Sequence, residues 1–208
     1  MWCPQCGQPI TIDPEGSWSC SLHGLVPPFS GCKEPSVYVL LEHTTRTRFA
    51  GRFPTWVPWP MPASWSVSGV GVVGDRHTLA TVLACSGPDP LGGAGDVVVV
   101  AEEPRTGLGA RFAGLDGLDP DPAVFARAAD AKVTVSGHPT PLWHLPAAED
   151  RAVYVGEASG CWLWLVGWPP LASAAVLLDA TALVDLATIT AELDLIPLTG
   201  VSPRLLAP

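Results

Sequence analysis

Four residues near the start of the chain have the types and spacing of a metal site. Cys3 and Cys6 are separated by two residues and followed by a glycine, and Cys20 and His23 repeat this arrangement. Thiolates and imidazoles are the ligands that zinc prefers, and two such half-sites are typical of a zinc ribbon. The sequence therefore predicts a zinc site formed by Cys3, Cys6, Cys20 and His23. Cys32 is a possible replacement ligand, although His23 has the better spacing.

This site is expected to be structural. Four protein ligands complete the coordination sphere of one Zn²⁺ ion per chain and leave no open position for water or substrate. Metal binding would fold a segment of roughly thirty residues that cannot form a core of its own. Between the half-sites, the turn signal Asp13-Pro14-Glu15-Gly16 predicts a short hairpin that carries the second half-site at its end.

Composition limits what the rest of the chain can be. With 208 residues, 48% of them apolar and 15% charged, the chain must fold around one sizeable core beside the ribbon. The net charge of −9 resides in residues 61–208, which makes contact with nucleic acid or anionic membranes unfavourable. Neither a secretory signal nor a membrane-spanning run is visible, so we expect a cytoplasmic protein whose thiols are reduced.

The elements that must carry these residues are mainly strands. Segments rich in Val, Leu and Trp predict strands at 65–73, 78–85, 96–101, 132–136, 151–156 and 161–166. Residues 37–44 have helical spacing but β-branched content, so helix and strand remain equal alternatives. The proline-rich run 54–62 must be extended, with Trp56, Trp59 and Trp65 packed against the large domain.

Near the C-terminus we predict a strand at 174–178 and then a long helix. Its apolar stripe would contain Leu183, Leu186, Ala187, Thr190 and Leu193. A further helix is expected at 122–130. The predicted fold class is α+β, with an N-terminal zinc ribbon followed by a twisted antiparallel β-sheet domain and a C-terminal helix on one face. The expected divisions are a ribbon at 1–33, a connector and Pro/Trp-rich strap at 34–63, and the α+β domain at 64–208.

Outside the ribbon, the candidate sites are two glycine-rich runs, 86–96 and 106–114. The first has no lysine and lacks the spacing of a phosphate-binding loop, but either run could line a ligand pocket. Cys85 and Cys161 lie in apolar strands, where a thiol is usually inert. No nucleophile–base pair can be assembled, so no catalytic residue is assigned.

Four stretches of the chain together resemble an uncharacterised family of actinobacterial zinc-ribbon proteins. These are the run from Cys3 to His23, the strap 56–62, the loop 84–93 and the tail 202–206. The resemblance implies no established activity. Members are sometimes labelled phosphotransacetylase, a label that we discount because this chain is too small and lacks a recognisable acyl-phosphate site.

The leading functional hypothesis is a cytoplasmic protein-interaction or regulatory module with a structural zinc ion. An apolar patch near the second half-site, with Leu22, Leu25, Val26 and Phe29 as candidates, would contact a protein partner or dock onto the chain's own large domain. An alternative is a small enzyme or ligand-binding protein that uses runs 86–96 and 106–114. A third hypothesis is nucleic-acid contact through the ribbon and the basic residues Arg46, Arg48 and Arg52.

Overall fold

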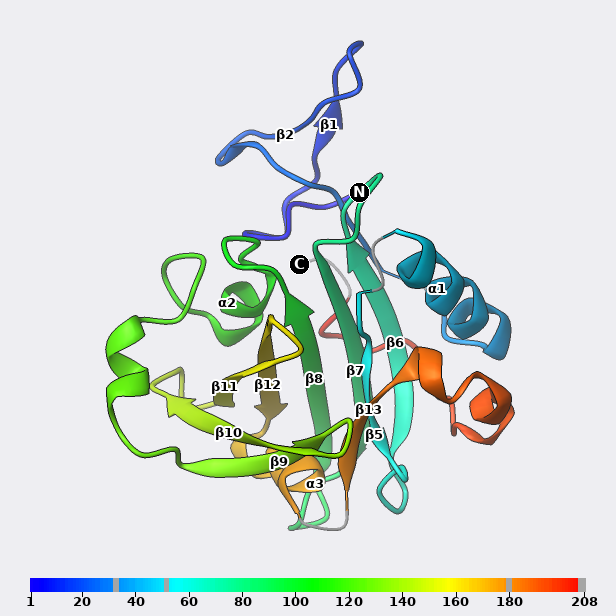
Figure 1. The fold of residues 1–208 in the computed structure, drawn as a ribbon, viewed down its shortest axis with the longest axis vertical. Helices are drawn as coiled ribbons and strands as arrows, with labels where there is room; N and C mark the ends of the chain where they lie inside the picture. Colours follow the sequence, from blue (N-terminus) through cyan, green and yellow to red (C-terminus); the bar gives the residue numbers. More distant parts are fainter. Residues whose placement is uncertain (32–33, 51–52, 179–180, 206–208) are drawn as a thin grey trace.

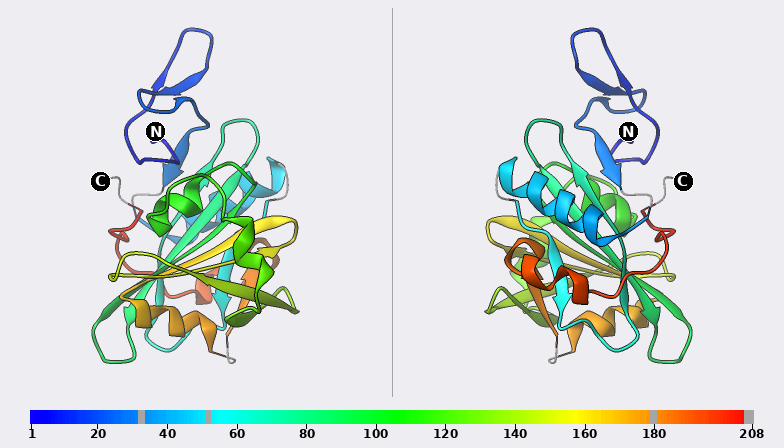
Figure 2. Two further views of the ribbon diagram at one scale, coloured as in Figure 1. Left: turned by 90° about the vertical axis from the view of Figure 1, so that its left-hand side faces the viewer. Right: turned by 90° about the vertical axis from the view of Figure 1, so that its right-hand side faces the viewer.

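The computed structural model describes residues 1–31, 34–50, 53–178 and 181–205, and consists of a small sheet and a large one (Figure 1). The small sheet contains β1 (Thr11–Ile12), β2 (Trp18–Cys20) and β3 (Gly24–Leu25), in that order. Both side views show this part protruding from the rest of the molecule (Figure 2). The expected hairpin is confirmed, since β1 and β2 pair antiparallel around a turn closed by Asp13.

The large sheet has ten strands and is mostly antiparallel, as expected for the α+β class. Their spatial order is β4 (Phe29–Gly31), β6 (Ser66–Val73), β7 (Ala80–Pro88), β8 (Ala94–Glu102), β12 (Cys161–Trp168), β11 (Ala152–Ala158), β10 (His138–Leu145), β9 (Ala131–Val135), β13 (Ala182–Asp185) and β5 (Trp56–Trp59). β5 at one end of this order also contacts β7 and β8 near the middle. The sheet therefore curls back over itself.

Curling of the sheet gives the central strands two buried faces. On β7, Leu83 points into a core enclosed by the curled sheet, whereas Val82 points into a second core on the opposite face. The second core is covered by α2 (Leu108–Ala113), whose Phe112 packs there with Trp164 of β12. Strands buried on both faces read as continuous apolar runs, which is the pattern at Val97–Ala101.

Residues 37–44 form a helix, which settles the two alternatives for this segment. Helix α1 (Val37–Phe49) begins at Ser36, whose side chain accepts a hydrogen bond from the backbone N–H of Val39 at 3.2 Å. Its inner face buries Leu40 and His43 against the body of the molecule, by which we mean the large sheet and the elements packed on it. None of the helices within the described residues has the length and apolar character of a bilayer span.

The predictions for the C-terminal part are wrong in type. Residues 174–178 were expected to be a strand, but η2 (Pro170–Ser173) leads directly into the short helix α3 (Ala174–Leu177). The expected long helix is replaced by β13 and two 3-10 segments, η3 (Leu186–Thr188) and η4 (Thr190–Leu195). Of the predicted apolar stripe, Leu183, Leu186 and Leu193 are buried, whereas Ala187 and Thr190 are only partly buried. A strand followed by 3-10 turns buries these three leucines and also fills the gap between β9 and β5.

Two further segments differ from the prediction. The helix expected at 122–130 is a single 3-10 segment, η1 (Pro122–Ala126), and β10 was not predicted.

The proline-rich strap is extended as expected and supplies β5, with Trp56 and Trp65 almost completely buried. The segment expected to be the end of the ribbon contributes β4, which pairs with β6 of the large sheet.

Candidate metal centre

The four residues predicted as zinc ligands lie together in the small N-terminal part. One ligand atom from each of Cys3, Cys6, Cys20 and His23 lies within 4.8 Å of all the others. The His23 Nδ1 atom is 3.6 Å from both the Cys3 and the Cys20 sulfur atoms, and the Cys6 and Cys20 sulfurs are 3.7 Å apart. This cluster can hold a metal ion. Cys32 falls outside the described residues.

Local backbone geometry brings the four side chains together. The N–H of Gly7 donates to the Cys3 carbonyl at 2.9 Å and closes the first turn, with Gly7 in the left-handed region at φ 75°. In the second half-site, Cys20 ends β2 and its sulfur accepts the backbone N–H of Leu22 at 3.5 Å. Gly24, at φ 67°, then turns the chain into β3.

The surroundings give the cysteines different acidities. Burial raises the pKa of the Cys3 thiol to about 11. Burial also acts on Cys20, but hydrogen bonds from the Leu22 backbone N–H and from His23 outweigh it and lower the pKa of the Cys20 thiol to about 6. A bound cation would draw the proton from Cys3 as well, because coordinated thiols ionise.

The first half-site is pressed against the body near α2. The backbones of Trp2 and Phe29 exchange hydrogen bonds of 3.0 and 2.8 Å, which joins the residue before Cys3 to β4. Gln5 reaches Gly107, the residue before α2, so closely that a side chain at Gly107 would meet the Gln5 Cγ atom at 3.2 Å. Arg111 of α2 lies over Phe29, with its guanidinium carbon 5.5 Å from the ring centroid. The metal site thus borders the large sheet.

The two glycine-rich runs do not form one pocket. Run 86–96 is mostly strand, and its tip is closed by Asp89, which accepts the N–H groups of Leu91 and Gly93. Run 106–114 forms α2 at the opposite end of β8 (Figure 1). Beside the first tip, Trp65, Pro88 and other apolar residues line a groove of about 410 Å³.

The two other described thiols, Cys85 and Cys161, have the environment expected of inert side chains. Cys85 is fully buried and Cys161 is 8% exposed. Burial raises the pKa of both, that of Cys161 to about 11. His77 and His138 are exposed and separate from the cysteine cluster.

Arg46 and Arg48, the two described residues of the basic cluster, have different surroundings. The Arg46 guanidinium donates to the Ser30 hydroxyl at 3.1 Å and to the Gly74 carbonyl at 2.9 Å, which ties α1 to the body. Arg48 lines a hollow between α1 and η4, which contributes Thr190. Arg52 is not among the described residues.

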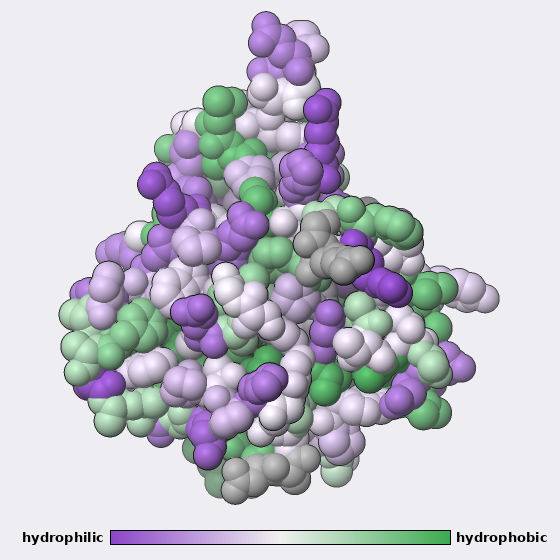
Figure 3. All heavy atoms as spheres, viewed as in Figure 1, coloured by the Kyte–Doolittle hydropathy of each residue, from purple (hydrophilic) through white to green (hydrophobic). Residues whose placement is uncertain are grey.

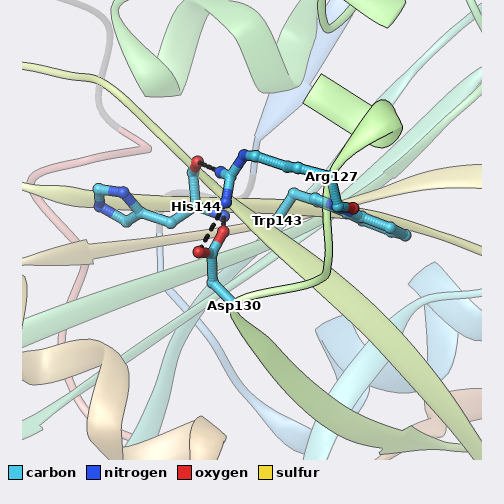
Figure 4. A network of polar contacts seen from close by, with 4 residues as sticks. All are labelled: Arg127, Asp130, Trp143 and His144. Carbon is cyan, nitrogen blue, oxygen red and sulfur yellow. Dashed lines mark hydrogen bonds and ion pairs between the residues drawn. The ribbon is translucent and has the colours of Figure 1, made fainter. Parts of the chain in front are cut away.

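A separate polar network on the surface has a structural role. Arg127 binds Asp130 and the His144 carbonyl, each at 2.7 Å, and its own carbonyl accepts the Trp143 indole N–H (Figure 4). The Arg127 guanidinium lowers the pKa of the Asp130 carboxyl. These contacts fasten the segment after η1 to β10.

Sequence reasoning missed the buried residue Glu102 and the half-buried residue Arg111. Glu102 ends β8 and is fully buried, and its Oε2 atom accepts the N–H groups of Leu108 and Gly109 at 2.8 and 3.2 Å. The NH1 nitrogen of Arg111 is also buried. The single base within the second glycine-rich run was the available signal for Arg111.

Fold and site together define an α+β protein with an N-terminal Cys₃His cluster that can bind a metal ion. The family model that describes a family of unknown function, DUF6758, matches residues 1–205, and the chain belongs to this family. No curated protein and no solved structure matches the chain.

Proposed function

We propose that Cys3, Cys6, Cys20 and His23 bind one structural zinc ion, and that the metal-bound ribbon contacts a protein partner in the cytoplasm. The mutual spacing of the four ligand atoms carries this proposal. Zn–S bonds of ~2.3 Å and a Zn–N bond of ~2.0 Å at tetrahedral angles put two sulfurs about 3.8 Å apart and a sulfur and a nitrogen about 3.5 Å apart. The distances of 3.7 and 3.6 Å between these atoms fit that geometry.

The small size of the ribbon core supports a structural role for the metal. Its buried apolar cluster contains Cys3, Ile10, Cys20 and Val26, so two of the four members are themselves proposed ligands. Such a core is too small to order the segment alone, and metal binding would supply the missing folding energy. Four protein ligands leave no coordination position for a substrate.

An interaction role is supported by apolar side chains that the ribbon exposes. Leu22 is 70% and Leu25 is 76% exposed, whereas Val26 and Phe29, the other two candidates, are buried. Figure 3 shows hydrophobic side chains on the side of the protruding part. Exposed leucines on a rigid, metal-bound hairpin would offer a contact surface without adding chemistry.

The metal is tested by elemental analysis of the purified chain. We expect one zinc per chain, lost in Cys3→Ser and in Cys20→Ser and retained in Cys161→Ser, which changes a thiol outside the cluster. Full zinc content in the first two variants would disprove the site.

The contact surface is tested by affinity capture from the native cytoplasm. A Leu22→Ser/Leu25→Ser variant should lose partners that the wild type retains. The matched control is Leu91→Ser/Leu195→Ser, because these leucines are 82% and 70% exposed but lie outside the ribbon. Equal capture by both double variants would exclude the ribbon as the contact.

A further inference from the structure

Arg111 is half-buried and has one buried nitrogen without a hydrogen-bond acceptor among the described residues. It lies in α2, with its guanidinium carbon 5.0 Å from the Phe112 ring centroid and 5.5 Å from that of Phe29. Its NH1 nitrogen is buried and has no hydrogen-bond acceptor in the described part of the chain. A buried cationic N–H group without an acceptor is costly, so such groups are normally paired.

The first half-site lies beside α2, because Trp2 pairs with the Phe29 under this guanidinium and Gln5 packs at Gly107. Trp2 is next to Cys3, and Gln5 lies between the two cysteines, so these contacts hold the arrangement. Burial lowers the pKa of Arg111, and negative charge on Cys3 and Cys6 opposes this shift.

We propose that Arg111 is a positioning residue of the metal centre, whose buried NH1 group donates a charge-assisted hydrogen bond to the thiolate sulfurs of Cys3 and Cys6. The inference rests on the proposed function, since it requires a cation that ionises these thiols. Three thiolates and a neutral imidazole around a divalent cation carry a net charge of −1, which the guanidinium neutralises. Thiolates accept such hydrogen bonds, and charged groups around a metal's ligands tune its affinity.

With this arrangement, metal binding depends on residues of both the ribbon and the body. With a cation bound, Arg111 would gain its missing acceptor and α2 would be held more firmly against the ribbon. The coupling is reciprocal: the free energy that an ordered α2 with Arg111 adds to metal binding equals the free energy that metal binding adds to the ordering of α2.

The first test uses the full-length chain loaded with Co²⁺, which takes tetrahedral thiolate–imidazole sites and absorbs visibly. In Arg111→Met we expect the sulfur-to-cobalt charge-transfer band to move to lower energy, because the thiolates lose a hydrogen-bond donor. Co²⁺ affinity, measured by competition with a chelator, should fall by about 10–100-fold. Arg111→Lys keeps the charge and should recover part of both effects.

The matched control is Arg151→Met. Arg151 also donates to α2, at the Phe112 carbonyl at 2.9 Å, and lies 5.4 Å from the Trp168 ring centroid, but its other hydrogen bonds go to Asp150 and not to the ribbon. The Co²⁺ absorption spectrum and the Co²⁺ affinity of Arg151→Met should equal those of the wild type. An Arg111→Met protein with an unchanged band and affinity would overturn the inference. A wild type that binds no Co²⁺ tetrahedrally would instead overturn the proposed metal site.

A second measurement needs no variant and so does not depend on whether Arg111→Met folds. Hydrogen exchange of the wild-type backbone is compared before and after removal of the metal. We expect amides 108–113 to exchange faster in the metal-free protein, while those of β12 keep their rates. Equal exchange of 108–113 in both states would overturn the inference.

Discussion

The Oε2 atom of Glu102 lies 2.8 Å from the backbone nitrogen of Leu108, which ties the last residue of β8 to the first residue of α2. Burial raises the pKa of Glu102 from 4.5 to about 7, even though this hydrogen bond and that from Gly109 act in the opposite direction. Because α2 also carries Arg111, this carboxyl supports the element that borders the metal site.

The first prediction concerns Glu102→Gln. Since the folded pKa lies above the unfolded one, the native state holds more protons between them, and the free energy of unfolding falls as pH rises from about 4.5 to about 7. Across this window the wild type should lose about 3 kcal/mol relative to the variant, which has no proton to release. Urea unfolding near the two ends of the window, followed by tryptophan fluorescence, measures the difference.

A pH-independent difference between wild type and Glu102→Gln would contradict this assignment. Glu103→Gln is the control for the loss of one negative charge, because Glu103 is the neighbouring residue and is exposed.

The second prediction is that Gly109→Ala strongly destabilises the body. A Cβ atom at this position would overlap the indole of Trp164, which is fully buried and cannot move aside. We expect a loss of about 3 kcal/mol in the free energy of unfolding. Gly200→Ala is the control, because nothing in the described structure lies within 4 Å of the added atom, and it should leave the unfolding midpoint unchanged.

The sequence was most informative where a feature is local. All four proposed ligands are contained in 21 consecutive residues, from Cys3 to His23, so their spacing alone identified them. The contact of Arg111 with the ribbon joins positions separated by about a hundred residues, and no spacing rule relates them. Only the folded structure shows that the body completes the surroundings of the cluster.

β10 was missed because it contains Pro139 and Pro141, which argue against a strand. In the structure these prolines pair with β9 on one side, while pairing with β11 begins only at Trp143. Their missing N–H groups therefore remove no ladder hydrogen bond with β11, so proline is tolerated here. The C-terminal helix failed differently: spacings of three and seven residues between buried Leu183, Leu186 and Leu193 fit 3-10 turns after a strand as well as a helix.

The third prediction is that Ser36→Ala weakens α1. The mutation removes the side-chain acceptor for the Val39 N–H and should lower the free energy of unfolding by about 1 kcal/mol. Thr45→Ala is the control within the same helix, because Thr45 is exposed and bonds only back to the Leu41 carbonyl. If Thr45→Ala lowered the free energy of unfolding as much as Ser36→Ala does, this would argue against a capping role for Ser36.

The fourth prediction is that Cys85 and Cys161 react slowly with thiol reagents in the folded protein. Both are buried, and burial raises the pKa of each thiol, which leaves little thiolate at neutral pH. Peptide mapping after brief alkylation should find neither residue modified before urea is added. Rapid labelling of either one at neutral pH would revive a catalytic role for that cysteine.

The pairing of β5 with β13 joins residues 56–59 to residues 182–185 and closes the curled sheet. Contacts between such distant segments form late in folding, because a long loop must close before they give any stabilisation. During synthesis, β5 and β9 would remain open edges until residue 185 had left the ribosome, and open edges invite pairing with other chains. The emerging chain should therefore depend on chaperones until its last strand arrives.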